Sequence, residues 1–279
     1  GGGGPASNRW QMHCQDRWLA RARPRIVVWP WENHAWERAF CRSARRAGVT
    51  TLGHQHTVIG RHQINYAVTG NPDGLTSVPD RVAANGPAYR DELERWGVPA
   101  ERLRIGGAFR IARAGANLHD PSGPVFVPLS ATPELAALQV EAARIVAASD
   151  RRVLVKEHPM YPFAFSETAT LARTDIPLLR HSGLSAVIYA SGTSGLEGLL
   201  AGVPSVRLLG EERISIDVLP GTVAGLSSAL AATLDEVLPV LAAAAPPAPL
   251  AWDEVFAEPD MNFWRGTLGD GISPEANRT

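Results

Sequence analysis

Residues 189–204 of this 279-residue chain (YASGTSGLEGLLAGVP) carry polar side chains in an order suited to binding a phosphate group. The pattern is typical of a strand end, a turn and a short helix. The turn supplies helix-capping hydroxyls and glycines that let another group approach the backbone, namely Ser191, Thr193, Ser194, Gly192 and Gly195. Free N–H groups at the helix start, together with the helix dipole, favour an anion such as a diphosphate.

About 30 residues upstream, residues 153–159 form a second candidate, in which an apolar strand precedes Lys156, His158 and Pro159. Open α/β sheets bind ligands at the C-terminal ends of their strands. A neutral imidazole N–H can donate to a phosphate oxygen, so we expect His158 to contact phosphate, with Lys156 beside it. The alternative is a solvated strand end. We expect no metal site, because no second ligand stands two or four residues from His158.

Glu197 has two interpretations. It stands three residues after Ser194, so it can close a Ser-x-x-Glu capping box at the helix start. It can equally have a functional role at that position. Both roles stay open at this point.

The first half of the chain offers a tryptophan-rich loop, residues 29–36, that places Glu32, Asn33 and His34 between an expected strand and an expected helix. These side chains should lie at the C-terminal end of a strand and face the active cleft. Glu32 is the predicted catalytic base or nucleophile, and aromatic faces suit sugar rings. The alternative is that Asn33 caps the helix while its neighbours are solvated.

A second polar cluster of this half is residues 53–57, with His54 and His56 two positions apart. The pair could ligate a metal, but no third ligand with fixed geometry is visible. An acid–base role for His56 and a loop role are both open. Asn85 ends another expected strand and is either part of the cleft wall or part of a turn.

Strand and helix patterns alternate along the chain, which predicts parallel sheets in an α/β protein. The expected strands are residues 25–29, 49–52, 81–84, 103–105, 125–129, 152–155, 177–179, 186–189 and 205–208. The expected helices are residues 35–47, 87–96, 133–148, 165–173 and 222–238. Pro239 is expected to stop the last of these helices. A linker-like segment at residues 114–123 separates two halves.

We therefore expect two Rossmann-like domains with a cleft between them. The predicted ranges are 5–115 for a small or truncated N-terminal Rossmann-like domain, 122–268 for a C-terminal Rossmann-like domain, and 1–4 and 269–279 for flexible ends.

Composition excludes several classes of protein. The net charge of −1 argues against a nucleic-acid partner. The two cysteines, Cys14 and Cys41, form no Cys-x-x-Cys motif, which favours a reducing compartment over a disulfide framework. The chain has no Gly-x-Gly-x-x-Gly motif and no Walker A loop, which disfavours dinucleotide oxidoreductases and P-loop kinases. No signal peptide or membrane span is evident, so a cytoplasmic protein, peripheral to the inner membrane at most, is expected.

Taken together, the two phosphate-binding segments resemble the donor half of GT-B glycosyltransferases, over roughly residues 25–215. The bacterial enzymes of surface-polysaccharide synthesis that use CMP-activated acidic sugars, of Kdo or sialic acid type, look most similar. The resemblance implies that His158 and Pro159 hold the donor phosphate and that Glu197 holds the ribose. It implies phosphate contacts for the hydroxyls of residues 191–194. The Glu-Asn pair of the tryptophan-rich loop also looks like a segment of these enzymes.

The resemblance implies transfer of Kdo or another CMP-activated sugar to a surface glycan or glycolipid of capsule or lipopolysaccharide. The nucleotide sugar is then a substrate, no cofactor is needed, and polysaccharide-assembly proteins are candidate partners. The alternatives are a UDP-sugar transferase, a nucleotide-sugar epimerase or a polyol-phosphate transferase on the same fold. A non-catalytic nucleotide-binding subunit is a further alternative.

Overall fold

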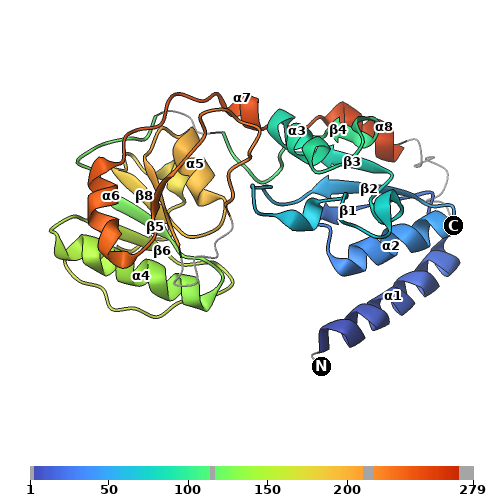
Figure 1. Cartoon of the computed structure of the whole chain (residues 1–279), viewed down its shortest axis with the longest axis horizontal. Helices are drawn as coiled ribbons and strands as arrows, with labels where there is room; N and C mark the ends of the chain where they lie inside the picture. The colour runs from blue at the N-terminus through green and yellow to red at the C-terminus, as the bar shows by residue number, and fades with distance from the viewer. Residues whose placement is uncertain (1–2, 114–116, 210–216, 270–279) are drawn as a thin grey trace, which may run out of the picture. The chain divides into compact units, whose positions relative to one another are not determined.

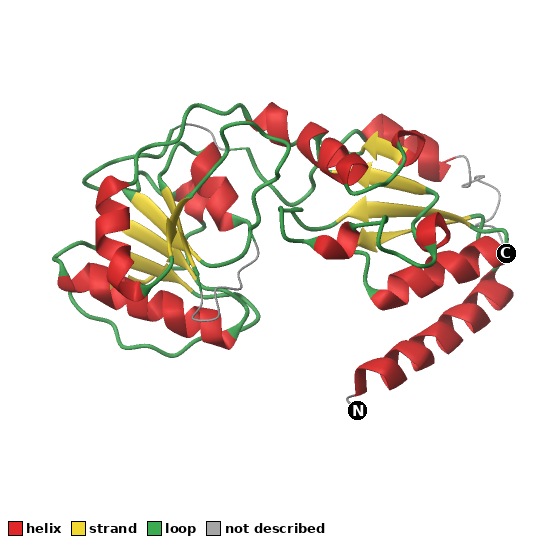
Figure 2. Ribbon diagram, viewed as in Figure 1, coloured by secondary structure: helices red, strands yellow, loops and turns green. Residues whose placement is uncertain are grey.

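A computed structural model describes residues 3–113, 117–209 and 217–269, which fall into two compact units, each built on one parallel sheet (Figures 1 and 2). The first unit comprises Gly1–Ile59, Gln63–Ala112 and the chain from Asp253, and the second comprises Gly60–His62 and Arg113–Trp252. The predicted α/β class with two parallel-sheet bodies is confirmed. The units differ from the predicted ranges at the C-terminal end, because the segment after Trp252 returns to the first unit.

The first sheet has the strand order β1-β2-β3-β4, with every pair parallel. Its strands are β1 (Ile26–Trp31), β2 (Thr50–Gln55), β3 (Arg81–Ala84) and β4 (Leu103–Ile105). Side chains alternate across the sheet, so Val27 and Trp29 pack toward Phe40, while Ile26 and Val28 pack toward Trp264. Both faces of the sheet are therefore covered by helices.

The main helices of this unit are α1 (Gly3–Ala22), α2 (Ala35–Arg46), α3 (Pro87–Arg95) and α8 (Met261–Gly269), with short 3₁₀ helices η1 (Ile64–Tyr66), η2 (Gly74–Ser77) and η3 (Ala100–Arg102) and the short α7 (Trp252–Val255). Helix α2 stops where Gly48 takes φ +70°, and α3 stops before Gly97 at φ +93°. Glycine is favoured at both positions, because a residue in the left-handed region ends a helix.

The second sheet has the order β10-β9-β8-β5-β6-β7, again all parallel. Its strands are β5 (Val125–Pro128), β6 (Val153–Lys156), β7 (Leu171–Arg173), β8 (Ala186–Tyr189), β9 (Ser205–Leu208) and β10 (Ala229–Ala231). From β5 the chain adds β6 and β7 on one side, then returns to place β8 on the other. This reversal creates a topological switch point between β5 and β8, where open α/β sheets bind ligands.

Helices α4 (Pro133–Ala148), α5 (Ser194–Leu200) and α6 (Val237–Ala243), with 3₁₀ helices η4 (Leu178–Arg180) and η5 (Leu234–Glu236), complete the second unit. Helix α4 buries Ala136, Val140, Ala143 and Ala147 against the sheet, a spacing of three to four residues that forms one face of a helix. This apolar face attaches α4 to the central strands.

Two predicted elements between β6 and β8 are wrong. The helix expected at residues 165–173 is instead a loop that ends in β7, which pairs with β6. The Arg173 guanidinium holds this segment, because it donates to Glu157, to Glu167 and to the carbonyl of Phe165. The strand expected at residues 177–179 is instead the 3₁₀ helix η4. Sheet pairing and side-chain contacts outweigh local propensity here.

The helix expected at residues 222–238 is also wrong. Its alanine- and leucine-rich middle forms β10, whose backbone completes the edge of the sheet beside β9. Pro239 does not stop a helix but lies in the first turn of α6, where its missing N–H costs no hydrogen bond.

The expected flexible ends differ as well, since Gly3 and Gly4 begin α1 and Gly269 ends α8. Residues 1–2 and 270–279 lie outside the described part of the chain. Helix α1 was not expected, and its packing explains it, because Leu19 is buried beside Phe40.

Candidate functional site

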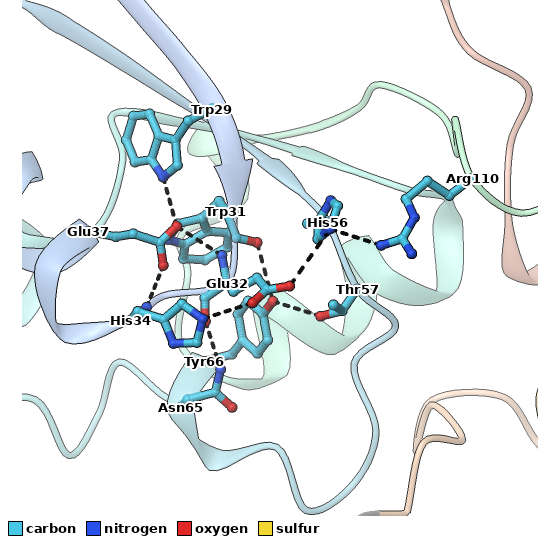
Figure 3. Close-up of polar contacts among 10 residues, drawn as sticks. All are labelled: Trp29, Trp31, Glu32, His34, Glu37, His56, Thr57, Asn65, Tyr66 and Arg110. Carbon is cyan, nitrogen blue, oxygen red and sulfur yellow. Dashed lines mark hydrogen bonds and ion pairs between the residues drawn. The ribbon is translucent and has the colours of Figure 1, made fainter. Parts of the chain in front are cut away.

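A cluster of ionisable side chains lies at the C-terminal ends of the first unit's strands (Figure 3). Glu32 directly follows β1, and its Oε2 atom lies 2.8 Å from Nε2 of His34. Its other oxygen, Oε1, lies 4.0 Å from Nε2 of His56, the residue that follows β2. The structure therefore brings three of the predicted residues together around one carboxylate, whose side chain is 29% exposed.

The buried carboxylate of Glu37 holds this loop in place. It accepts hydrogen bonds from Trp29 Nε1 at 2.8 Å, from the backbone N–H of Glu32 at 3.1 Å and from the backbone N–H of His34. His34 is the N-cap of α2 and Glu37 is its N3 residue, so the two form a capping box. Sequence reasoning missed Glu37, although its spacing from the helix start was the available signal.

Asn33 does not cap α2. Its backbone takes φ +58°, and its Nδ2 atom donates to the carbonyl of Asn65 at 2.6 Å. Asn65 returns a bond, from its own Nδ2 to the Glu32 carbonyl, at 2.7 Å. Asparagine tolerates this left-handed conformation better than most residues. The two bonds between Asn33, Glu32 and Asn65 link the loop after β1 to η1.

Arg110 joins the cluster, and sequence reasoning missed it. Its Nη1 atom lies 2.9 Å from Nε2 of His56. A guanidinium can only donate, so His56 Nε2 accepts in this contact and the ring proton lies on Nδ1. Arg110 follows β4 by five residues, and the parallel order of the strands brings it to the same edge as Glu32 and His56.

His54 belongs to a different environment from His56. Its Nε2 atom lies 3.2 Å from the Gly107 carbonyl, and its ring packs against Phe109 and Trp264. Burial lowers the pKa of His54, although the bond to Gly107 opposes this effect. No group of three or more potential metal ligands occurs among the residues that the structure describes.

Asn85, the remaining predicted cleft residue, is buried at the end of β3. Its N–H donates to Gln55 Oε1 at 2.9 Å and its carbonyl accepts from the N–H of Ala257. These backbone bonds give Asn85 a structural position, and its contact with an acceptor stays a prediction.

In the second unit, Ser191 and Ser130 mark the switch point. Ser191 follows β8 and Ser130 lies two residues beyond β5, and their Oγ atoms are 2.8 Å apart. The N–H of Ser130 donates to buried Gln139 at 2.7 Å, which fixes the loop before α4. Ser130 was missed, because only the strand order shows that its strand adjoins that of Ser191.

The two glycines of the turn have different roles. Gly192 is exposed at φ +103° and a Cβ there would meet nothing within 4 Å, so the backbone is open to a ligand. Gly195 is different, since a Cβ there would lie 2.3 Å from the Tyr189 ring. The group that approaches Gly195 is therefore an aromatic ring of the protein itself.

Helix α5 begins at Ser194 with Thr193 as its N-cap, and no side-chain hydrogen bond caps it. The expected capping by residues 191–194, including the Ser194–Glu197 capping box, is thus wrong. Glu197 is half-buried, and burial raises the pKa of its carboxyl. Its predicted contact with a nucleotide remains a prediction.

Lys156 ends β6 and donates from Nζ to the carbonyl of Asp175 at 2.9 Å. His158 lies two residues further, and its Nδ1 accepts from the N–H of Met160 at 3.3 Å. The proton of a neutral ring is then on Nε2, which leaves that N–H as a donor. Pro159 beside it is exposed. Strand β5 lies between β6 and β8, so Ser130 follows the strand that separates the strand of Lys156 from the strand that precedes Ser191.

No protein-family model matches the chain, and no curated protein matches it. Solved structures do match. UDP-GlcNAc 2-epimerase from Neisseria meningitidis bound to UDP-GlcNAc is 10% identical, with a TM-score of 0.56 over 94% of this chain and 81% of that one. The S. aureus MnaA–UDP co-structure is 11% identical, with a TM-score of 0.53 over 90% and 78%. Arabidopsis thaliana UGT89C1 complexed with quercetin is 13% identical, with a TM-score of 0.52 over 85% and 67%.

The chain has the GT-B fold of two Rossmann-like domains. At these identities the likeness is one of fold. No helix within the described ranges combines the length and the apolar character that a membrane span requires.

Proposed function

We propose that this GT-B chain is a nucleotide-sugar-dependent glycosyltransferase, in which the second unit holds the nucleotide and the first unit activates the acceptor. The observation that carries the proposal is the switch point between β5 and β8, with hydroxyls of Ser130 and Ser191 at its two strand ends. Two structural neighbours of the same fold were solved with UDP or UDP-GlcNAc.

The donor phosphates would meet neutral donors and one fixed cation. One hydroxyl proton lies between Ser130 and Ser191, so the other hydroxyl can turn its proton outward, and the open backbone at Gly192 lets a phosphate approach. His158 offers its Nε2–H, while Lys156 is held by Asp175 and adds a positive charge. The resemblance of these segments to transferases of CMP-activated acidic sugars supports a Kdo-type donor.

In the first unit, Glu32 would act as general base. Its carboxylate takes the proton of the acceptor hydroxyl as that oxygen bonds to the anomeric carbon. The bond from the anomeric carbon to the donor phosphate breaks, and the nucleotide leaves with the electron pair. His34 holds Oε2 of Glu32 and Arg110 fixes the ring of His56, so both groups enter the reaction already oriented.

Nucleotide-sugar epimerisation is the second candidate, because the Neisseria meningitidis neighbour named above and a Rickettsia bellii protein of the same fold are UDP-GlcNAc 2-epimerases. Product analysis separates the two. An epimerase converts UDP-GlcNAc alone to its 2-epimer, whereas a transferase releases free nucleotide only when an acceptor is present.

A thermal-shift panel of CMP, CDP, UDP, GDP and ADP tests the donor site. We expect CMP or CDP to stabilise the protein more than GDP or ADP. A ligand at 100 times its Kd should add about 2.7 kcal/mol to the free energy of unfolding. The largest shift with UDP would move the assignment to a UDP-sugar donor, and a flat response at millimolar nucleotide would reject the donor site.

His158→Ala should weaken nucleotide binding and leave the fold intact, because the Nε2–H donor is lost. A hydrogen bond to a charged phosphate contributes about 1.5–3 kcal/mol, which corresponds to roughly 10- to 150-fold in Kd. Calorimetric titration measures the loss, and His119→Ala, a half-buried histidine of the same unit, is the matched control. Unchanged affinity with an unchanged circular dichroism spectrum would make His158 a strand-end residue only.

A further inference from the structure

The first unit contains an apolar pocket beside the ionisable cluster, with a volume of about 350 Å³. Residues from β1, β2, the loop after β4, and α8 line it, among them Val28, Pro30, His54, Phe109, Met261 and Trp264. Its size falls in the range of about 300–1,000 Å³ that is usual for small-molecule sites.

Three aromatic rings form a rigid wall of this pocket. The rings of His54, Phe109 and Trp264 lie 5.3–5.7 Å apart, centre to centre, in tilted or edge-to-face contacts. Trp264 is anchored, because its Nε1 donates to the Gly106 carbonyl at 2.8 Å. A Cβ at Gly106 would lie 2.9 Å from the indole, so this glycine makes room for the ring. Phe109 in contrast is 53% exposed and leaves a ring face for a ligand.

Few of the side chains that line the pocket carry a polar atom. His54 must donate from Nε2 to the Gly107 carbonyl, since a carbonyl only accepts, and this leaves Nδ1 with a lone pair. A sugar ring carries hydroxyl groups that need partners when they are buried, and Val28, Pro30 and Met261 offer no side-chain partner. A flat apolar ring needs none.

The pocket and the ionisable cluster share the same segments. Pro30 lines the pocket and Glu32 lies in the cluster, and His54 at the end of β2 and His56 directly after it have the same spacing. Two residues of extended chain span about 7 Å. After β4, Phe109 lines the pocket and the adjacent Arg110 lies in the cluster. A ligand of one or two rings in the pocket would therefore place an attached hydroxyl within reach of Glu32.

We propose that this pocket is the subsite for an aromatic ring of the acceptor, so that the acceptor is a phenol, or an alcohol or glycoside carrying such a ring next to the reacting hydroxyl. The inference rests on the proposed transferase function, because only a transferase has an acceptor. The test of the pocket needs no nucleotide, so the pocket proposal and the transferase proposal can fail separately.

The test is calorimetric titration of the full chain with 4-methylumbelliferone, a two-ring phenol, and with methyl glucoside, a sugar without an aromatic ring. We expect the phenol to bind and the glucoside to give no heat. Met261→Trp, at a residue 47% exposed, should fill the pocket and weaken phenol binding about tenfold or more. Phe109→Ala removes part of the wall and should weaken binding about 2- to 12-fold.

Trp10→Ala is the matched control, since Trp10 is an exposed aromatic residue of the same unit on α1. It should leave phenol binding unchanged. Absence of phenol binding, or binding that neither pocket variant weakens, overturns the inference. Neither of these two results bears on the donor site, which the thermal-shift panel of nucleotides tests independently. If no nucleotide stabilises the protein but the phenol still binds, the result counts against the transferase assignment alone.

Discussion

Glu32→Gln should abolish most sugar transfer while nucleotide affinity stays near that of the wild type. The amide keeps the shape of the side chain but cannot take a proton from the acceptor hydroxyl. Loss of a general base lowers turnover by about 10²–10⁴. Affinity should not change, because the predicted donor residues all belong to the second unit and Glu32 belongs to the first. The measurement pairs nucleotide titration with a transfer assay on the same preparation.

Glu94→Gln provides the matched control, as the same change at an exposed position of the first unit. It should leave both quantities unchanged. Retained transfer in Glu32→Gln would contradict the catalytic role and leave His56 as the next candidate. Loss of affinity together with loss of fold would make Glu32 a structural residue.

Glu37→Ala should have the largest effect on stability. The buried carboxylate accepts from the Trp29 indole and from the backbone N–H groups of Glu32 and His34, so its removal leaves three donors without this acceptor. Hydrogen bonds to charged groups contribute about 1.5–3 kcal/mol each, and we expect a loss of about 3 kcal/mol or more in the free energy of unfolding. Denaturant titration measures it.

A second effect of Glu37→Ala shows whether Glu37 positions the loop that carries Glu32 or contributes to the stability of the fold alone. At temperatures where the variant remains folded, transfer should fall with little change in nucleotide affinity, because the loop that carries Glu32 loses its anchor. Glu94→Ala, an exposed change in the same unit, should alter stability by less than about 0.5 kcal/mol. A Glu37→Ala protein as stable as this control would contradict the anchoring role.

Local pattern was sufficient for most strands and helices. The apolar runs at Arg81–Ala84, Leu103–Ile105, Ala186–Tyr189 and Ser205–Leu208 are strands with the expected bounds, and Pro133–Ala148 is the expected helix. In these segments the periodicity of apolar side chains, the residues that end each element and the burial required by a parallel sheet all indicate the same secondary structure. The residues that follow strands, such as Glu32, His56 and Ser191, were found for the same reason.

The helices predicted from local propensity were wrong at the two edges of the second sheet, where the chain instead pairs with a neighbouring strand. The segment around Ala229–Ala231 has a helical composition, yet its backbone groups pair with β9. The segment ending in Leu171–Arg173 pairs with β6 and is held by the Arg173 guanidinium. Hydrogen bonds to a neighbouring strand are a property of the fold, and no local window of sequence contains them.

Periodicity along single segments was enough to predict the α/β class, the two-part organisation and the polar residues at individual strand ends. Which strand ends are neighbours could not be predicted in this way. The tertiary structure placed Arg110 against His56, and Ser130 against Ser191 at the switch point, and it packed Trp264 beside His54 from a helix more than 200 residues away in the chain. Strand order and the return of the C-terminal segment set these contacts, since they depend on pairing between segments that are distant in sequence.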